Sequence, residues 1–203
     1  MKRRVPRVYW ALARTKDFFF VQRWGNYYDG SNPDLQKPER CLLELQKDIP
    51  SYITTILNLG CGAGRDFIPF DGKLALWGID IVPLKRIHWV RAFQNLRYEH
   101  CSVEKLTRRL ERGRIDLSNT LVFGGGTLMY VSSENQKRFW EACRASGCRN
   151  FIFQEFRPGS PLYPTNNFQI PVSNFQVQYF RKEGAELPTY FSFAHAHQTN
   201  STS

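Results

Sequence analysis

Short apolar runs alternate with longer mixed stretches through the middle of the chain. Five runs rich in β-branched and aliphatic residues predict strands: TTILNLG, LALWGIDIV, LRYEHCSV, NTLVFGG and RNFIFQEF. Between them, LKRIHWVRAFQN and SSENQKRFWEACRAS show helical periodicity, with Ser133 as a cap of the second and Phe139, Ala142 and Cys143 on one of its faces. Strands that alternate with helices indicate a mostly parallel sheet covered by helices on both faces.

The two ends of the chain follow other patterns. Residues 3–20 and 37–47 have helical spacing before the first strand. FQVQYFRKEGAELPTYFSFAHAH predicts two aromatic strands that form an antiparallel hairpin on the edge of the sheet. We therefore expect one domain over residues 1–203, which consists of an N-terminal helical appendage or lid (1–50), a ligand-binding core (51–157), and a loop with the terminal hairpin (158–203).

Composition narrows the classes of protein. With 203 residues and 42% hydrophobic positions, the chain is long enough for one well-packed core. The net charge of +10 raises the expectation of a polyanionic partner. No apolar run reaches the roughly 18 residues of a membrane span, and the basic start lacks an apolar signal region. Five cysteines without CxxC pairs indicate reduced thiols and no metal site. We expect a cytoplasmic protein that has no membrane partner.

The stretch ILNLGCGAGRDF places three glycines at every second position directly after a predicted strand. Gly60, Gly62 and Gly64 would let backbone N–H groups approach a ligand at the end of that strand. The dinucleotide fingerprint GxGxxG fails, because Arg65 stands where its last glycine belongs. Asp80 ends the second predicted strand, twenty residues after Gly60, where a carboxylate can accept both hydroxyls of a ribose.

With these features, residues from about Ile53 to Glu155 resemble the class I S-adenosylmethionine-dependent methyltransferases, whose first motif is similar to NLGCGAGRDF and whose second strand ends like WGIDIV. The resemblance implies a Rossmann-like fold with a mostly parallel seven-stranded sheet and a C-terminal antiparallel hairpin. It implies S-adenosyl-L-methionine as the cofactor, with the glycines near its methionine part and Asp80 on its ribose. The implied cofactor-binding residues are Asn58, Gly60, Cys61, Gly62, Gly64, Asp80, Ile81, Ser102, Val103, Gly124 and Gly125.

The chain departs from the family at Asn58, where the family usually has an acidic residue. A neutral amide weakens the expected contact with the ammonium group of the cofactor. Methyl transfer is an in-line displacement that mainly requires positioning. If the acceptor is a hydroxyl, a general base helps, and the chain offers Tyr130, Glu155 and, less favourably, His195 or His197.

The sequence leaves more than one class of methyl acceptor open. The sequence FGGGTLMY after the fourth predicted strand lacks the motif of enzymes that methylate the amines of bases, and also the aspartate of ribose 2′-O enzymes. We expect a small-molecule or sugar-like acceptor. RNA, with cap-type guanine N7 chemistry, is the alternative. It is favoured by three clusters of basic residues: Lys2, Arg3, Arg4 and Arg7; Lys85, Arg86 and Arg91; and Lys105, Arg108, Arg109, Arg112 and Arg114. A catalytically inactive methyltransferase-like binding partner is the third reading, and no oligomeric state is predicted.

Overall fold

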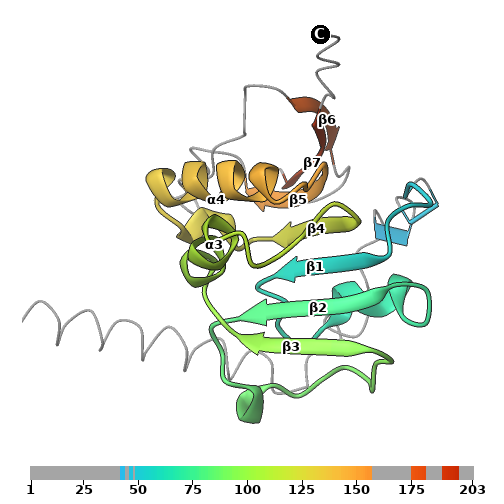
Figure 1. The fold of residues 1–203 in the computed structure, drawn as a ribbon. Helices are drawn as coiled ribbons and strands as arrows, with labels where there is room; N and C mark the ends of the chain where they lie inside the picture. The colour runs from blue at the N-terminus through green and yellow to red at the C-terminus, as the bar shows by residue number, and fades with distance from the viewer. Residues whose placement is uncertain (1–41, 44–45, 48, 157–174, 182–188, 197–203) are drawn as a thin grey trace, which may run out of the picture.

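The protein is described by a computed structural model over residues 42–43, 46–47, 49–156, 175–181 and 189–196. The described strands form one sheet with the order β3-β2-β1-β4-β5-β7-β6 (Figure 1). They are β1 (Thr55–Leu59), β2 (Ala75–Asp80), β3 (Leu96–His100), β4 (Thr120–Gly125), β5 (Asn150–Phe156), β6 (Phe175–Arg181) and β7 (Thr189–Ala196). The first five are parallel, which confirms the predicted α/β class, whereas β7 pairs antiparallel with both β5 and β6.

The chain direction across the sheet reverses between β1 and β4. From β1 the chain continues outward through β2 to β3, and then returns to the other side of β1 to form β4 and β5. In register, Leu59 at the end of β1 lies between Ile79 of β2 and Gly124 of β4. Open α/β sheets bind ligands outside the carboxyl ends of the strands at such a reversal. The topology therefore predicts a ligand site at the segments that follow β1 and β4.

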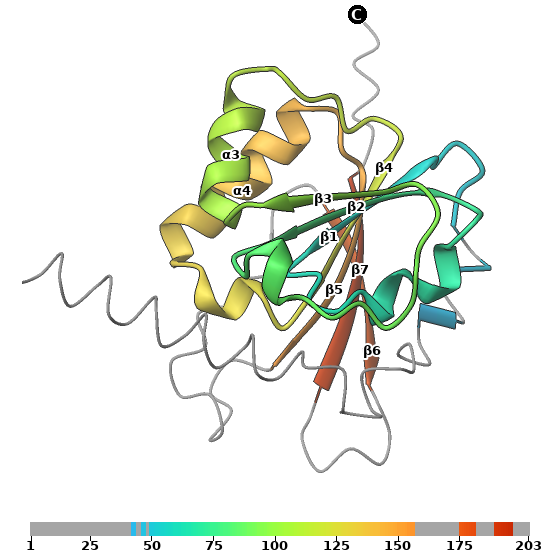
Figure 2. The ribbon, with the colours of Figure 1, turned by 90° about the horizontal axis from the view of Figure 1, so that it is seen from below.

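The two faces of the sheet are covered differently. Helices α3 (Val103–Glu111) and α4 (Ser133–Ala145) lie together on one face, as Figure 2 shows. Their apolar residues, among them Leu106 and Phe139, share a buried cluster with Leu57 and Val122 of the sheet. On the opposite face, the short 3-10 helix η2 (Arg65–Phe70) buries Phe67 and Phe70 against β1, β2 and β4. Two further single turns, η3 (Leu84–Arg86) and η4 (Leu128–Tyr130), complete the described elements.

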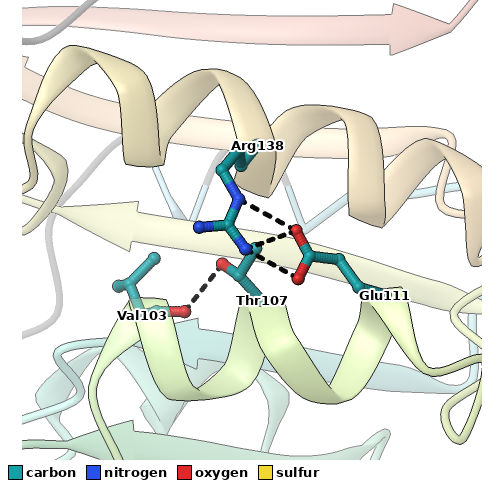
Figure 3. A network of polar contacts seen from close by, with 4 residues as sticks. All are labelled: Val103, Thr107, Glu111 and Arg138. Atoms are coloured by element: carbon teal, nitrogen blue, oxygen red, sulfur yellow. Dashed lines mark hydrogen bonds and ion pairs between the residues drawn. The ribbon is translucent and has the colours of Figure 1, made fainter. Parts of the chain in front are cut away.

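A bidentate ion pair joins the two long helices. The Arg138 guanidinium of α4 donates from Nη2 to both carboxylate oxygens of Glu111 at 2.8 Å and from Nε to one of them at 3.0 Å (Figure 3). Within α3, the Thr107 hydroxyl donates to the carbonyl of Val103 at 2.8 Å. The ion pair is exposed, so it orients the helices while the apolar cluster beneath supplies most of the stabilisation.

The predicted helix over residues 84–95 is wrong, because only Leu84–Arg86 form a 3-10 turn. The Arg86 and Ile87 N–H groups bond to carbonyls three residues earlier, and two later donors of the segment bond to distant parts of the protein. Val90 donates to the Ala63 carbonyl at 3.1 Å, and the Gln94 N–H donates to the Asp71 carboxylate at 2.9 Å. Tertiary contacts thus override the periodicity of the sequence.

The predicted α4 is confirmed, but its cap is one residue earlier. Ser132 accepts from the Asn135 N–H at 3.3 Å, and Ser133 is already helical. Of the predicted helix over 37–47, Leu42 and Leu43 are helical, residues 46 and 47 form a turn, and the others lie outside the described residues. The predicted helix over 3–20 and the predicted loop after Arg157 also lie outside them. Over the described part of the chain, no helix has the length and apolar character needed to cross a membrane.

Candidate functional site at the carboxyl edge of the sheet

The glycine turn after β1 has a backbone conformation that favours glycine. Gly60, Gly62 and Gly64 have φ angles of 67°, 49° and 82°, a region that other residues enter only at a cost. The N–H groups of Gly60 and Cys61 both donate to the Ile79 carbonyl of β2, at 2.8 and 3.1 Å. These two bonds fix the turn to β2 without the help of a ligand.

Two of the three glycines also face the protein itself. A Cβ atom on Gly60 would lie 2.1 Å from the Thr127 Oγ1 atom, and one on Gly64 would lie 2.8 Å from the Phe93 ring and 2.9 Å from the Trp89 ring. At these two positions the close approach that the sequence predicted is made by protein side chains. A ligand is not needed to explain why glycine stands there.

Asp80 is the buried carboxylate that organises this edge. Its side chain is 5% exposed, and its Oδ2 and Oδ1 atoms accept from the N–H groups of Gly62 at 2.9 Å and Val82 at 2.8 Å. Burial raises the pKa of Asp80, while bonds from the backbone of Val82, Gly62 and Ile81, and the His100 charge, act in the opposite direction. An ionised carboxylate has about four acceptor positions, so it retains capacity for a hydroxyl donor.

Two side chains of β3 hold the turn that follows Asp80. The Tyr98 hydroxyl donates to the Val82 carbonyl, and His100 Nε2 lies 2.9 Å from the Ile81 carbonyl. Burial, and then the negative charge of Asp80, raise the pKa of Tyr98, so its hydroxyl stays protonated and a donor at neutral pH. Sequence reasoning missed both residues, although their i, i+2 spacing on the strand beside β2 places them on one face.

Asn58 is a buried amide in the centre of the sheet. Its side chain is 1% exposed, and neither its oxygen nor its nitrogen has a hydrogen-bond partner among the described residues. In register it lies between Gly78 of β2 and Phe123 of β4. A Cβ on Gly78 would touch the Cys61 sulfur at 2.7 Å and the Phe67 ring at 3.3 Å, so apolar groups surround the position. Leaving such an amide unsatisfied costs roughly 1–3 kcal/mol per group.

The end of β4 comes back to the glycine turn. The Thr127 hydroxyl donates to the Leu59 carbonyl at 2.9 Å and thereby joins the ends of β1 and β4. A Cβ on Gly124 would lie 3.0 Å from the Phe153 ring, and one on Gly125 would lie 4.0 Å from the Asp66 Oδ2 atom. Thr127 and Asp66 were not predicted as site residues. Only the strand register, which a single sequence does not contain, brings Thr127 to this edge, whereas Asp66 lies there because it follows Gly64 by two residues.

The remaining predicted residues have separate places in the fold. Ser102 caps α3 by accepting from the Lys105 N–H at 3.3 Å, and Val103 is the first, buried residue of that helix. Tyr130, proposed as a base, ends η4 and is 45% exposed. Glu155 lies on β5, but its side chain is outside the described ones, as are those of His195 and His197.

The cysteines are free thiols in the described part of the chain. Cys61, Cys101, Cys143 and Cys148 are buried, and burial raises the pKa of each, with the Asp80 charge adding to the effect at Cys61. They are therefore protonated, unreactive thiols at neutral pH. Among the described residues, no group of three or more His, Cys, Asp or Glu side chains could hold a metal ion.

Solved structures share this fold. The bifunctional kinase-methyltransferase WbdD matches with a TM-score of 0.61 and 16% identity over 82% of this chain, which spans only 43% of the WbdD chain. The 1,6-didemethyltoxoflavin-N1-methyltransferase of Burkholderia thailandensis, solved with S-adenosylhomocysteine, matches with a TM-score of 0.60 and 15% identity over 97% of this chain and 92% of that one. Magnesium protoporphyrin IX methyltransferase of Synechocystis PCC 6803, solved with bound SAM, matches with a TM-score of 0.55 and 14% identity over 97% of this chain and 87% of that one.

These likenesses concern the fold. No protein-family model matches the sequence, and neither does any curated protein. The strand order and these likenesses show that the chain has the α/β Rossmann-like fold of these methyltransferases.

Proposed function

We propose that the protein is an S-adenosylmethionine-dependent methyltransferase that moves a methyl group to a small-molecule or sugar-like acceptor by in-line displacement. The observation that carries the proposal is the pairing of two features at the ends of β1 and β2, beside the reversal of the sheet. A glycine turn follows β1, and the buried Asp80 carboxylate at the end of β2 is fixed to that turn through the Gly62 N–H. This is the arrangement that a nucleoside bound across the ends of β1 and β2 requires.

The residues present fit the cofactor. Asp80 keeps acceptor capacity for the ribose hydroxyls, and the backbone after β1 faces the end of β4 across the Thr127 hydrogen bond. Ile81, Ser102 and Val103 are proposed to border the adenine, and Gly124 and Gly125 the reacting methyl group. When bound, S-adenosylmethionine supplies an electrophilic methyl group on a positively charged sulfur. The protein holds the acceptor in line with it and excludes water.

A small acceptor is supported by two of the structural neighbours, whose names specify 1,6-didemethyltoxoflavin and magnesium protoporphyrin IX. Tyr130, at the exit of β4, is the described side chain that we propose as a base for a hydroxyl acceptor, together with Glu155 on β5. In this role Tyr130→Phe lowers the rate of transfer to a hydroxyl and leaves transfer to a ring nitrogen unchanged.

RNA is the second candidate, favoured by the net charge of +10 and by a structural neighbour described as an rRNA methylase of Streptococcus thermophilus, with a TM-score of 0.55 and 9% identity. Two of the basic residues in question already have partners, however. Arg109 is paired with Glu99 and Arg91 with Asp71. We therefore place RNA behind a small acceptor.

Calorimetry with S-adenosylhomocysteine tests the proposed function first. Binding at micromolar concentration supports it, whereas no binding by the folded protein would leave an inactive scaffold as the better reading. Labelled-methyl transfer into metabolite and RNA pools then distinguishes the acceptors. If RNA binds through its phosphates, the logarithm of the binding constant falls with the logarithm of the salt concentration, with a slope near −0.7 per phosphate contact on a single strand. The affinity for a small neutral acceptor should hardly change between low and physiological salt.

A further inference from the structure

The part of the site around Asn58 needs a negative charge if it is to receive a positively charged group. The methionine part of the proposed cofactor carries an ammonium group next to a carboxylate, and burying an ammonium without a countercharge is very costly. Asn58 is neutral, and Asp80 is assigned to the ribose hydroxyls at the end of β2. A countercharge for the ammonium group is therefore sought in another carboxylate, close to the ends of β1 and β4.

Asp66 lies at this place. It is the second residue of η2, directly after the glycine turn, and its side chain is 13% exposed. A Cβ on Gly125 would be 4.0 Å from the Asp66 Oδ2 atom and 3.5 Å from the tip of the Phe123 ring. The Asp66 carboxylate and the tip of the Phe123 ring thus both lie within 4.0 Å of the same Cβ position, at Gly125, the last residue of β4.

Asn58 belongs to the same region. It is the residue of β1 that stands opposite Phe123 in register, and it lies on the sheet face that η2 covers. Its fully buried amide, without a partner among the described residues, is a second and independent sign that a polar group is bound here. The amide provides hydrogen bonds without charge, and Asp66 provides the charge.

We propose that Asp66 on η2, and not a residue of β1, neutralises the ammonium group of the cofactor, with Asn58 as its uncharged hydrogen-bonding neighbour. This assignment rests on the proposed function. Arg65, whose Nε lies 3.5 Å from the Asp66 Oδ1 atom, limits the negative charge of the site before the ligand binds. In this role Asp66 distinguishes a nucleoside that carries the α-amino group from one that lacks it.

The test compares two ligands, S-adenosylhomocysteine and its deaminated analogue, in which hydrogen replaces the α-amino group. Asp66→Asn should weaken binding of S-adenosylhomocysteine about tenfold or more, the usual loss for a charge-assisted hydrogen bond, and should leave the analogue within about twofold. Asp71→Asn is the matched control, because it removes the same charge at the other end of η2, where the carboxylate pairs with Arg91. That control should retain the wild-type preference between the ligands.

Asn58→Asp in the Asp66→Asn background should restore the preference by returning a charge to the same region. Equal binding of both ligands by the wild-type chain, equal weakening of both by Asp66→Asn, or a folded double variant that stays indifferent would each overturn the assignment. These results differ from a failure of the proposed function, in which the wild-type protein binds neither ligand. Melting temperatures of all variants identify any that do not fold.

Discussion

Asp80 and Gly62, eighteen residues apart, are joined by a 2.9 Å hydrogen bond from the Gly62 N–H to the buried carboxylate. The bond ties the glycine turn of β1 to the end of β2. One side chain therefore both shapes the turn and, in the proposed function, binds the ribose. Effects on structure and on binding have to be separated when Asp80 is changed.

We expect Asp80→Ala to weaken S-adenosylhomocysteine binding by about 1.5–3 kcal/mol, the usual contribution of hydrogen bonds to a charged group. It should also lower the free energy of unfolding, because the N–H groups of Gly62 and Val82 lose their acceptor. Calorimetry and denaturant titration measure the two effects. Unchanged affinity in the folded variant would remove Asp80 from the site.

Ligand binding should depend on pH through the same carboxylate. Burial raises the pKa of Asp80 above the value of about 3.9 for an ordinary aspartate. The carboxylate that accepts from the ribose hydroxyls is therefore protonated at a higher pH than an ordinary aspartate is. Affinity should fall as the pH decreases through this raised pKa. Calorimetry across a pH series checks the trend. In Asp80→Asn, whose side chain does not titrate, the affinity should no longer fall at acidic pH.

Stability should change with pH in the other direction. A folded-state pKa above the unfolded value means that the folded protein holds the proton more tightly. The contribution of Asp80 to stability is thus fully present below the unfolded pKa and is lost as the pH rises through the folded one. The difference in unfolding free energy between wild type and Asp80→Asn, followed over pH, reports this contribution. A difference that does not vary with pH would contradict the raised pKa.

Gly60→Ala should be strongly destabilising because the new Cβ overlaps the Thr127 hydroxyl. Gly113→Ala is the matched control, since Gly113 has a similar φ of 63° with nothing within 4 Å of its Cβ position. We expect Gly60→Ala to cost about 1–3 kcal/mol more than the control, as overpacking does. Adding Thr127→Gly should remove most of the excess in a double-mutant cycle of unfolding free energies. An additive cycle would show that the strain has another source.

Tyr98→Phe should weaken ligand binding by about 0.5–1.5 kcal/mol, because the Val82 carbonyl loses its donor and the turn beside Asp80 loosens. Tyr52→Phe is the comparison, since the Tyr52 hydroxyl instead bonds to the Asn150 amide oxygen at 3.2 Å. Both variants should lose stability, but only Tyr98→Phe should lose affinity. Equal affinities of the two variants would exclude a positioning role for Tyr98.

The sequence alone predicted the glycine turn, Asp80 and the five parallel strands, because each depends on residues close together in the chain. The three positive φ angles follow from the glycines themselves, and Asp80 follows from the end of an apolar run. These are local properties, which periodicity and spacing describe well.

The residues that sequence reasoning missed act across strands. Thr127 reaches Leu59 only because β1 and β4 are paired, and Tyr98 reaches Val82 only because β3 lies beside β2. The false helix over residues 84–95 has the same origin. Its periodicity was real, but its Trp89 and Phe93 rings pack over Gly64, and its N–H groups bond to the glycine turn and to η2.

The crossover from β2 to β3 is consequently coupled to the glycine turn during local opening. Val90 is bonded to the Ala63 carbonyl at one end of η2, and Gln94 to Asp71 at the other. If the turn opens, the Val90 amide loses its acceptor at the same moment, so the two segments should exchange their amide hydrogens as one cooperative unit. The Val90 amide is then a natural reporter, because a ligand that closes the glycine turn slows its exchange without touching it.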